Sequence, residues 1–276
     1  MFEFKLYYPS ALLQKYVQYY VVTTISELKN ELAVQEILPM ALSGIHFMNI
    51  PGIVHFNHSE KEFDPAPLIS MIGQLTTKRL NKFLLQGNII TAIFSSFGLF
   101  KIWGIQMSHM SNTVCNALDI LNAAGLKSCW EQMFETLSSE QSIRILENFL
   151  LSNLEKNDFE LRKMDKIVDC INASKGNINI DWLAHESNMS LKTFERHFSE
   201  KIGLPPKVFT RIIRFSNAMK MLQMKKGTFE ILEVCGYTDQ SHLIKDFKAF
   251  TGKSPRQYYP GLQEMLSFFM EHSIKE

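Results

Sequence analysis

The side chains best suited to chemistry in this 276-residue sequence lie on two short stretches that predict helices with a polar outer face. Each stretch combines Lys or Arg with other polar side chains at helical spacing, behind a residue that can cap a helix. In the major groove of DNA, Arg and Lys can hydrogen-bond guanine and Gln can hydrogen-bond adenine. We therefore predict these base-reading residues: Lys192, Glu195 and Arg196 in the first helix, and Gln240, Ser241, Ile244 and Lys245 in the second.

Other side chains on or near the same helices suit the phosphate backbone rather than the bases. Hydroxyl groups, cations and helix N-termini hold phosphate oxygens in protein–DNA complexes. An acid on such a face is repelled by phosphate, so Glu195 must accept from cytosine N4 or pair with Lys192 or Arg196, and the sequence leaves these alternatives open. The predicted phosphate contacts are Ser190, Thr193, Ser199, Lys248 and Arg256.

A two-copy repeat places both stretches in the same structural context. Shifting residues 187–209 by 49 positions aligns apolar, basic, glycine and proline positions in one register. This register favours a functional role for the cations over the alternative that they are only solvated surface charges. Two copies of this size indicate a duplicated supersecondary unit, because a solenoid requires three or more. The aligned pairs are Phe194 with Leu243, Arg196 with Lys245, Phe198 with Phe247, Gly203 with Gly252, Pro206 with Pro255 and Phe209 with Tyr258.

Each copy has the pattern of a helix-turn-helix. In the first copy we expect Asp181 to cap a short helix, a turn at 187–189, and Ser190 to cap the second helix. In the second copy we expect Gly236 to make the turn and Asp239 to be the cap. The side chains expected to face the core are Leu191, Phe194 and Phe198 in the first copy and Leu243, Phe247 and Phe250 in the second.

A single long helix is expected to connect the two units. Its apolar residues recur at steps of four and three, which is the pattern of one buried helix face. Such a connector would hold the two second helices in successive major grooves, about 34 Å apart on one side of the duplex. The apolar stripe consists of Val208, Ile212, Phe215, Met219 and Leu222.

The segment from about Leu161 to Tyr259 resembles the DNA-binding domain of the AraC/XylS-type transcription regulators. GYTDQSHLIKDFKAFTGKSPRQYY carries most of the resemblance, and LAHESNMSLKTFERHFSEKIG is the more variable first unit. The resemblance covers roughly the last third of the chain and implies that the outward residues of both second helices touch bases. Three positions depart from the family: Leu232 replaces a small alanine, Ile244 replaces a polar base reader, and Tyr259 replaces a frequent arginine.

The preceding part of the chain predicts a mixed α and β domain. Short β-rich runs occupy residues 34–100, and helical spacing follows at 129–137 and 139–154. EILPMALSGIHF and AIFSSFGLFKIWGIQMSHMSN resemble the sensor-like domain of one subgroup of these regulators, which implies effector binding or dimerisation. The predicted fold class is α+β, with an N-terminal mixed β-barrel-like and helical domain followed by an all-α domain with two helix-turn-helix units joined by a long helix.

The charge of the chain changes between these two parts. Residues 160–260 hold 17 Lys and Arg against 11 Asp and Glu, whereas residues 1–159 hold 11 against 14. A basic C-terminal part suits a surface that faces phosphate. The expected divisions are an N-terminal effector-sensing or dimerisation domain over 1–155, a linker over 156–162, the DNA-binding domain over 163–260 and a C-terminal helical tail over 261–276.

The composition is typical of a globular protein, with 46% hydrophobic and 21% charged residues. Its longest apolar stretch, Ile89 to Phe100, is shorter than the roughly 20 residues of a membrane span and predicts a buried strand. Because no secretory signal is visible, we expect a cytoplasmic protein whose four separated cysteines are buried free thiols. The candidate partners are double-stranded DNA, a small-molecule effector, RNA polymerase and a second copy of the chain, with no membrane and no cofactor.

A metal site is the main alternative for the N-terminal part. His46, His55, His58 and Glu62 lie in one β-rich segment and together could hold a divalent cation, although their spacing matches no ligand signature. The alternative function is therefore a metal-dependent or ligand-binding barrel protein with C-terminal interaction helices. The sequence has no glycine-rich phosphate loop, nucleophile elbow or paired catalytic carboxylates in a suitable context, so we expect no enzyme and no metal.

Overall fold

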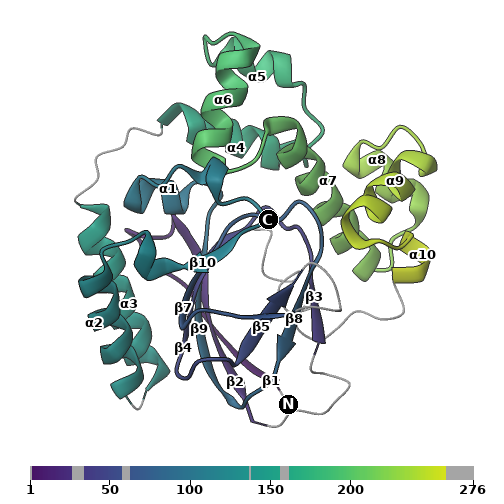
Figure 1. Ribbon diagram of the computed structural model, residues 1–276. Coiled ribbons are helices and arrows are strands. Elements are labelled where there is room, and N and C mark those ends of the chain that lie inside the picture. Colours follow the sequence, from purple (N-terminus) through teal and green to yellow (C-terminus); the bar gives the residue numbers. More distant parts are fainter. Residues whose placement is uncertain (1, 27–33, 58–62, 137, 156–161, 259–276) are drawn as a thin grey trace.

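The computed structural model describes residues 2–26, 34–57, 63–136, 138–155 and 162–258. Within these ranges, two antiparallel sheets pack face to face and three α-helices flank the larger sheet (Figure 1). An all-helical part follows and lies across one end of the sheets. The α+β class predicted from the sequence is confirmed.

The larger sheet has the strand order β1-β2-β9-β4-β7-β10. Strands β2, Val17–Ile25, and β9, Gly87–Phe94, are paired to each other and are mostly buried on both faces. Their Val, Ile and Tyr residues fit a sheet that is covered on both sides. The other strands of this sheet are β1, Phe2–Tyr7; β4, Ser43–Met48; β7, Ile69–Ile72; and β10, Val114–Asn116.

The smaller sheet has the strand order β3-β8-β5-β6 and lies against one face of the larger sheet. A cluster of buried side chains occupies part of the space between the sheets, with Phe2 and Phe83 in edge-to-face contact at a centroid distance of 5.0 Å. The strands are β3, Val34–Ile37; β5, Val54–Asn57; β6, Asp64–Pro65; and β8, Arg79–Phe83.

Helices cover the other face of the larger sheet. Their apolar residues, including Leu126 and Leu146, are fully buried against sheet residues such as Phe94. The α-helices are α1, Gly98–Trp103; α2, Ala123–Glu135; and α3, Ser139–Leu154, and two short 3₁₀ helices are η2, Met107–His109, and η3, Ala117–Asp119.

The C-terminal part packs its helices around buried phenylalanines. Phe198 meets Phe209 at a centroid distance of 5.4 Å, and Phe215 meets Phe247 at 5.0 Å. The helices are α4, Arg162–Ala173; α5, Ile180–Glu186; α6, Leu191–Ile202; α7, Pro206–Gln223; α8, Thr228–Cys235; α9, Gln240–Thr251; and α10, Pro255–Tyr258.

The two halves of the molecule share a hydrophobic core. Leu38, Ala41 and Phe97 from the N-terminal half belong to the same buried cluster as the C-terminal phenylalanines. Polar contacts add to this interface, because Gln74 Nε2 donates to the main-chain oxygen of Ile202 at 2.8 Å. The contact fixes the orientation of the helical part relative to the sheets.

The structure differs from the sequence-based expectation at several elements of the N-terminal half. Strands β1 and β2 precede the predicted β-rich range of 34–100, whereas β8 lies within it. The strand predicted through Phe100 ends at Phe94, because Gly98 begins α1. Helix α2 begins at Ala123, six residues before the predicted start.

The predicted domain ranges stay predictions. The chain at 156–161 and the tail at 261–276 lie outside the described residues, while Arg162, assigned to the linker, is the first residue of α4. Among the described helices, none combines the length and apolar character that a membrane crossing needs. The four cysteines are free, but only Cys129 and Cys235 are buried, with burial raising their pKa values to about 12 and about 11.

Candidate nucleic-acid interface

Helix α6 begins at a capped N-terminus on the surface. Ser190 is the cap, and its Oγ accepts from the Thr193 amide at 3.3 Å, as the sequence predicted. The preceding turn contains Asn188 in the left-handed region, at φ 54°. The cap expected for α5 was wrong, because Asn179 Oδ1 accepts from the Trp182 amide at 3.0 Å and Asp181 lies inside the first turn.

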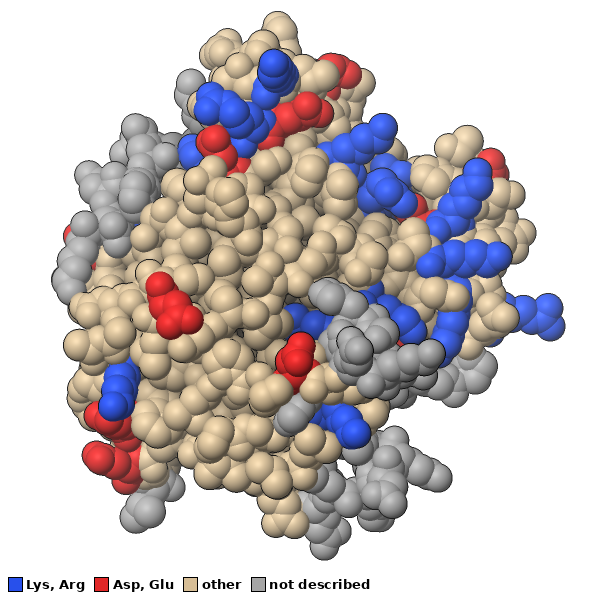
Figure 2. All heavy atoms as spheres, in the orientation of Figure 1, with Lys and Arg blue, Asp and Glu red and all other residues tan. Residues whose placement is uncertain are grey.

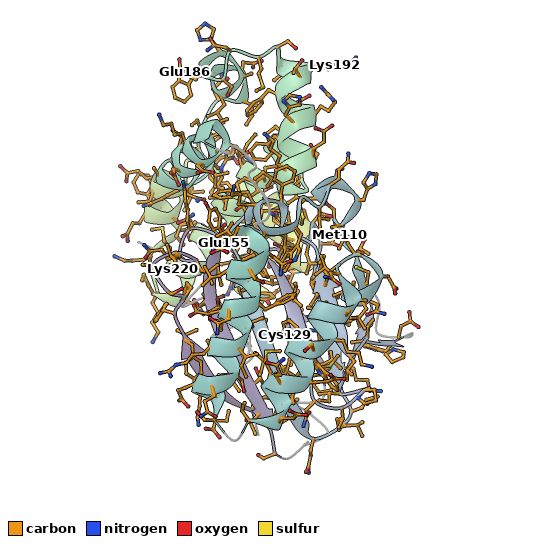
Figure 3. The ribbon with its side chains drawn as sticks, turned by 90° about the vertical axis from the view of Figure 1, so that its left-hand side faces the viewer. Met110, Cys129, Glu155, Glu186, Lys192 and Lys220 are labelled. Atoms are coloured by element: carbon orange, nitrogen blue, oxygen red, sulfur yellow. The ribbon has the colours of Figure 1, made fainter. Side chains whose placement is uncertain are left out.

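The outer face of α6 carries the three predicted base-reading residues. Lys192, Glu195 and Arg196 are all exposed, and Lys192 lies at the end of α6 farthest from the sheets (Figure 3). Arg196 Nη1 lies 3.4 Å from Glu200 Oε1 and its Nη2 lies 3.1 Å from His197 Nε2. In the described residues Arg196 therefore pairs with Glu200 rather than with Glu195.

Helix α9 repeats this arrangement in the second unit. Asp239 Oδ1 accepts from the His242 amide at 2.8 Å, which confirms the predicted cap. Gln240, Ser241 and Lys245 are exposed, whereas Ile244 is half-buried. Ile244, which departs from the family pattern, therefore exposes less of its side chain to solvent than the neighbouring predicted base readers do.

The repeat seen in the sequence has a structural counterpart at each helix end. Gly203 ends α6 at φ 99° and Gly252 ends α9 at φ 77°, a left-handed conformation that favours glycine. Pro206 and Pro255 then open α7 and α10. The two units therefore start and end their second helices in the same way.

The connector α7 is one continuous helix of 18 residues, as predicted. Ile212, Phe215 and Met219 on its apolar stripe are buried, and the outer members Val208 and Leu222 are half-buried against the same core. This packing fixes α7 between the two helix-turn-helix units.

An ion pair attaches α9 to the connector. Arg211 on α7 donates to Asp246 Oδ1 from Nη2 at 2.7 Å and from Nε at 3.1 Å. The Asp246 side chain is 2% exposed, whereas the Arg211 side chain is 39% exposed and lies over the ring of Phe250. The buried face of α9 is therefore fixed by charge as well as by its apolar residues.

The predicted phosphate contacts occupy different environments. Ser190, Lys248 and Arg256 are exposed, and Thr193 and Ser199 are half-buried. The Ser199 hydroxyl donates to the main-chain oxygen of Glu195 at 2.8 Å, so its hydrogen is already used within the helix. Lys248 and Arg256 have no ion-pair partner among the described residues.

Positive charge is concentrated on the helical part of the surface. Figure 2 shows Lys and Arg gathered over the top and right of the molecule, where α4–α10 lie, while the face over the sheets is largely uncharged. This distribution matches the charge difference found in the sequence and suits a polyanion.

One further expectation is modified by the structure, and the departures from the family pattern can be located in part. Leu191 was expected to face the core, but it is 40% exposed because it is the first residue of α6 and lies at the edge of the unit. Leu232 is half-buried and packs against the C-terminal core. Tyr259, the third departure from the family pattern, lies outside the described residues.

The structure does not test the suggested metal site, because most of its ligands lie outside the described residues. His46 lies on β4, while His58 and Glu62, and the side chain of His55, lie outside what the structure describes. In the described ranges, no group of three or more His, Cys, Asp or Glu side chains could hold a metal ion.

Sequence reasoning missed the contacts that attach each unit to the sheets. Ser111 Oγ donates to the oxygen of Gly203 at the end of α6, and Lys253 beside α10 lies 3.5 Å from Glu36 Oε1 of β3. Lys15 pairs with Asp165 of α4. No local sequence pattern could reveal these pairs, because their members are between about 90 and 220 residues apart.

Comparison with known proteins agrees with this geometry. Residues 183–259 match the family model described as a helix-turn-helix domain. An uncharacterized HTH-type transcriptional regulator of Haemophilus influenzae is 29% identical over 50% of this chain and 47% of its own length. The F1 operon positive regulatory protein of Yersinia pestis is 34% identical over 29% of this chain and 27% of its own length.

Residues 183–259 are therefore a helix-turn-helix domain. The chain spans about half or less of the length of the curated relatives it matches. The crystal structure of ToxT from Vibrio cholerae O395 aligns with 94% of this chain and 96% of that chain, at 12% identity and a TM-score of 0.45, a likeness too weak to assign function.

Proposed function

We propose that this protein is a cytoplasmic, sequence-specific DNA-binding transcription regulator that reads two successive major grooves with α6 and α9. The observation that carries the proposal is the pair of capped helices presenting equivalent polar faces on either side of α7. The helix-turn-helix model that matches residues 183–259 and the similarity to transcription regulators support it.

The two faces are expected to contribute differently. The α6 face offers an exposed triad of charged residues, so base contacts by Lys192 and Arg196 dominate there. On α9 the half-buried Ile244 leaves Gln240 and Lys245 as the polar base readers, with Lys248 positioned for phosphate. We therefore expect stronger base discrimination in the half-site bound by α6.

The first experiment is selection of bound sequences from a random DNA pool with the full chain. We expect two half-sites about 10 base pairs apart, because two grooves on one side of the duplex are read. A selected pool without any shared sequence would contradict sequence-specific binding. A single short half-site would contradict the proposal that both helices read bases.

Alanine variants then test the two faces separately. Arg196→Ala and Lys245→Ala should each weaken specific binding by about 1–3 kcal/mol and relax base preference in one half-site. Lys127→Ala, which removes a 64% exposed charge from α2, is the matched control and should leave binding unchanged. Unchanged affinity and preference in both test variants would refute the assignment of the reading faces.

A phosphate contact has a different signature. Lys248→Ala should weaken binding to specific and unrelated DNA alike and reduce the slope of log K against log salt by about 1. If it instead changed base preference without changing the slope, Lys248 would be a base reader.

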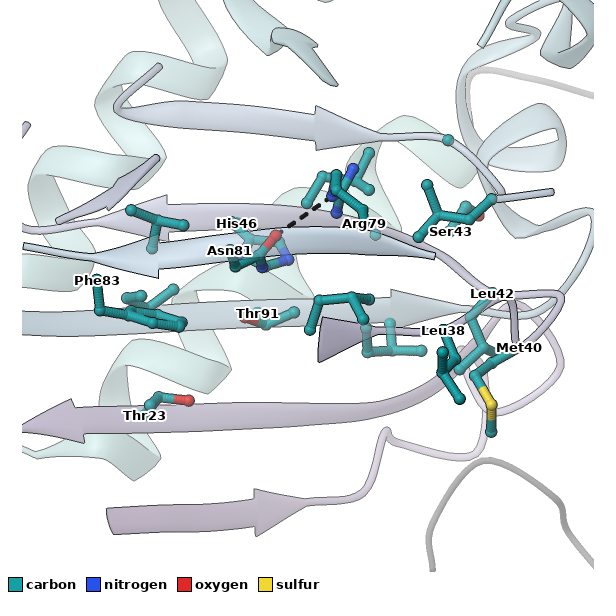
Figure 4. A pocket seen from close by; sticks show the side chains of 18 residues that line it. Thr23, Leu38, Met40, Leu42, Ser43, His46, Arg79, Asn81, Phe83 and Thr91 are labelled. Atoms are coloured by element: carbon teal, nitrogen blue, oxygen red, sulfur yellow. Dashed lines mark hydrogen bonds between the residues drawn. The ribbon is translucent and has the colours of Figure 1, made fainter. Parts of the chain in front are cut away.

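For the N-terminal half we propose effector sensing, because a cavity lies between its two sheets (Figure 4).

A homodimer and a contact with RNA polymerase stay predictions of the sequence. Sedimentation of the full chain tests the homodimer, which should appear at micromolar concentration. The alternative of a metal-dependent barrel protein is tested by metal analysis of the purified protein, where a stoichiometric metal would favour it.

A further inference from the structure

The two helix-turn-helix units meet where the turn between α4 and α5 approaches the turn between α8 and α9. Helix α7 lies between the units (Figure 1), and its residues 210–214 contact the first of these turns. Gly176 has φ 78°, and a Cβ on it would collide with the main-chain oxygen of Thr210. The α4–α5 turn therefore lies directly against the backbone of α7.

The next residue of the same turn reaches the second unit. Asn177 lies against Gly236, which ends α8 at φ 66°, and a Cβ on Gly236 would collide with the Asn177 side chain. Gly236 also begins the turn that leads to α9, the second predicted reading helix. A displacement of one turn relative to the other therefore breaks this contact.

The side chain of Arg214, on α7, contacts both turns at once. Its Nη2 donates to the main-chain oxygen of Gly176 at 3.0 Å, and its Cζ lies 5.5 Å from the centre of the Tyr237 ring. Tyr237 directly follows Gly236 and is 5% exposed, so its ring is held in the core. Because the guanidinium is planar and rigid, a hydrogen bond to one turn and stacking on the other keep the two turns at one separation.

The environment of Arg214 favours a positioning role over a purely stabilising one. Its Nε is buried without a hydrogen-bond partner. The guanidinium has no ion-pair partner in the part of the chain that the structure describes. A buried donor that is left unpaired costs free energy, so stability alone does not account for an arginine at this position.

The sheets hold the first unit more firmly than the second. Gln74, which is 1% exposed, donates to the end of α6, and Gly203 lies against the main chain of Met107. The ion pair of Lys253 with Glu36 leaves 49% of the Lys253 side chain exposed and therefore contributes little to holding the second unit. The position of α9 relative to α6 consequently depends mainly on α7 and on the contacts between the two turns.

We propose that Arg214 and Asn177 fix the separation and angle of α6 and α9, so that the chain binds half-sites at one spacing only. This inference rests on the proposed function, and the two side chains are positioning residues that act through the turns. Successive base pairs are rotated by about 34° and separated by about 3.4 Å. One base pair inserted between the half-sites therefore moves one half-site away from a fixed pair of helices.

The test measures the affinity of the full chain for its selected DNA site and for the same site with one base pair inserted between the half-sites. We expect the insertion to weaken binding by the natural chain at least about tenfold, because one helix loses its base contacts. Arg214→Met keeps the aliphatic stem but removes the guanidinium. The insertion should weaken binding by this variant less than about threefold, because loosely joined units can follow the displaced half-site. Asn177→Ala should relax the spacing preference in the same direction.

Two controls separate positioning from weaker binding. Asn217→Ala removes an α7 amide that donates to the main-chain oxygen of Ile213 in the same helix at 2.8 Å, and it should keep the tenfold preference. Asp239→Ala removes the α9 cap and should weaken binding at both spacings alike.

The spacing preference of the natural chain, retained in folded Arg214→Met and Asn177→Ala, would overturn the proposal. A natural chain that tolerates the insertion would overturn it as well. If Arg214→Met fails to fold, Asn177→Ala decides the question.

A measurement without DNA separates this proposal from the proposed function. Pulsed electron spin resonance between spin-labelled unnatural amino acids at positions 192 and 245 reports the separation of the outer faces of α6 and α9. We expect one narrow distance distribution in the natural chain and a broader one after Arg214→Met or Asn177→Ala. Equal widths would overturn the positioning role, whether or not the chain binds DNA. Absence of any specific DNA site would overturn the proposed function, while the distance result would stand.

Discussion

The pair Arg211–Asp246 should be strongly asymmetric in its contribution to stability. Asp246 is 2% exposed and Arg211 is 39% exposed, so the two truncations leave very different groups behind. Arg211→Ala leaves a buried carboxylate without its two donors, and we expect it to lower the free energy of unfolding by about 3–5 kcal/mol. Asp246→Ala leaves a cation that reaches solvent, and we expect a loss of about 1–3 kcal/mol.

Urea titration followed by circular dichroism at 222 nm measures both losses. The control is Glu230→Ala, which breaks a pair with Lys226 whose two side chains are each 45% exposed and should lower stability by less than about 1 kcal/mol. The double variant lacking both Arg211 and Asp246 should be more stable than Arg211→Ala alone, because the buried charge is gone. Equal losses in the two single variants, or a double variant no better than Arg211→Ala, would refute the argument.

Three further predictions follow from local features. Asp239→Ala removes the α9 cap and should lower stability by about 1 kcal/mol and weaken DNA binding, as measured by urea titration and a binding isotherm. Burial lowers the pKa of His46 from 6.5 in the unfolded chain to about 3 in the folded protein, so acid favours the unfolded chain. Lowering the pH from 7.5 to 5 should therefore reduce the free energy of unfolding by about 2 kcal/mol. The His46→Gln variant should lack this pH dependence. Lys225→Gly relieves a φ of 58° and should raise the melting temperature, whereas Lys226→Gly should lower it.

Features set by neighbouring residues could be predicted from the sequence. The caps at Ser190 and Asp239 and the continuous helix α7 depend on a few adjacent side chains, and the structure confirms them. The prediction of the α5 cap was wrong for a local reason too. Asn179 stands two residues before Asp181, and its side-chain oxygen caps the helix in place of the Asp181 carboxylate.

Features set by distant pairing could not be predicted. Arg79, Asn81 and Phe83 alternate along β8 and so share one face, but only the pairing of β8 with β3 and β5 makes that face interior. The period-2 pattern was a usable signal for a strand, yet it cannot tell an inward arginine from an outward one. The roles of the predicted base and phosphate contacts remain predictions, because exposure on a helix face does not show what the face binds.

The shared core at Leu38, Ala41 and Phe97 has a consequence for engineering. These residues complete the packing around α7, so an isolated C-terminal fragment would expose apolar surface that the full chain covers. A chimaera that joins this DNA-binding half to a foreign sensor would need a segment equivalent to residues 38–41, which follows β3 here, to cover that apolar surface. The two halves are thus less interchangeable than their separation in the sequence suggests. A functional domain exchange should require a sensor that supplies its own counterpart of residues 38–41.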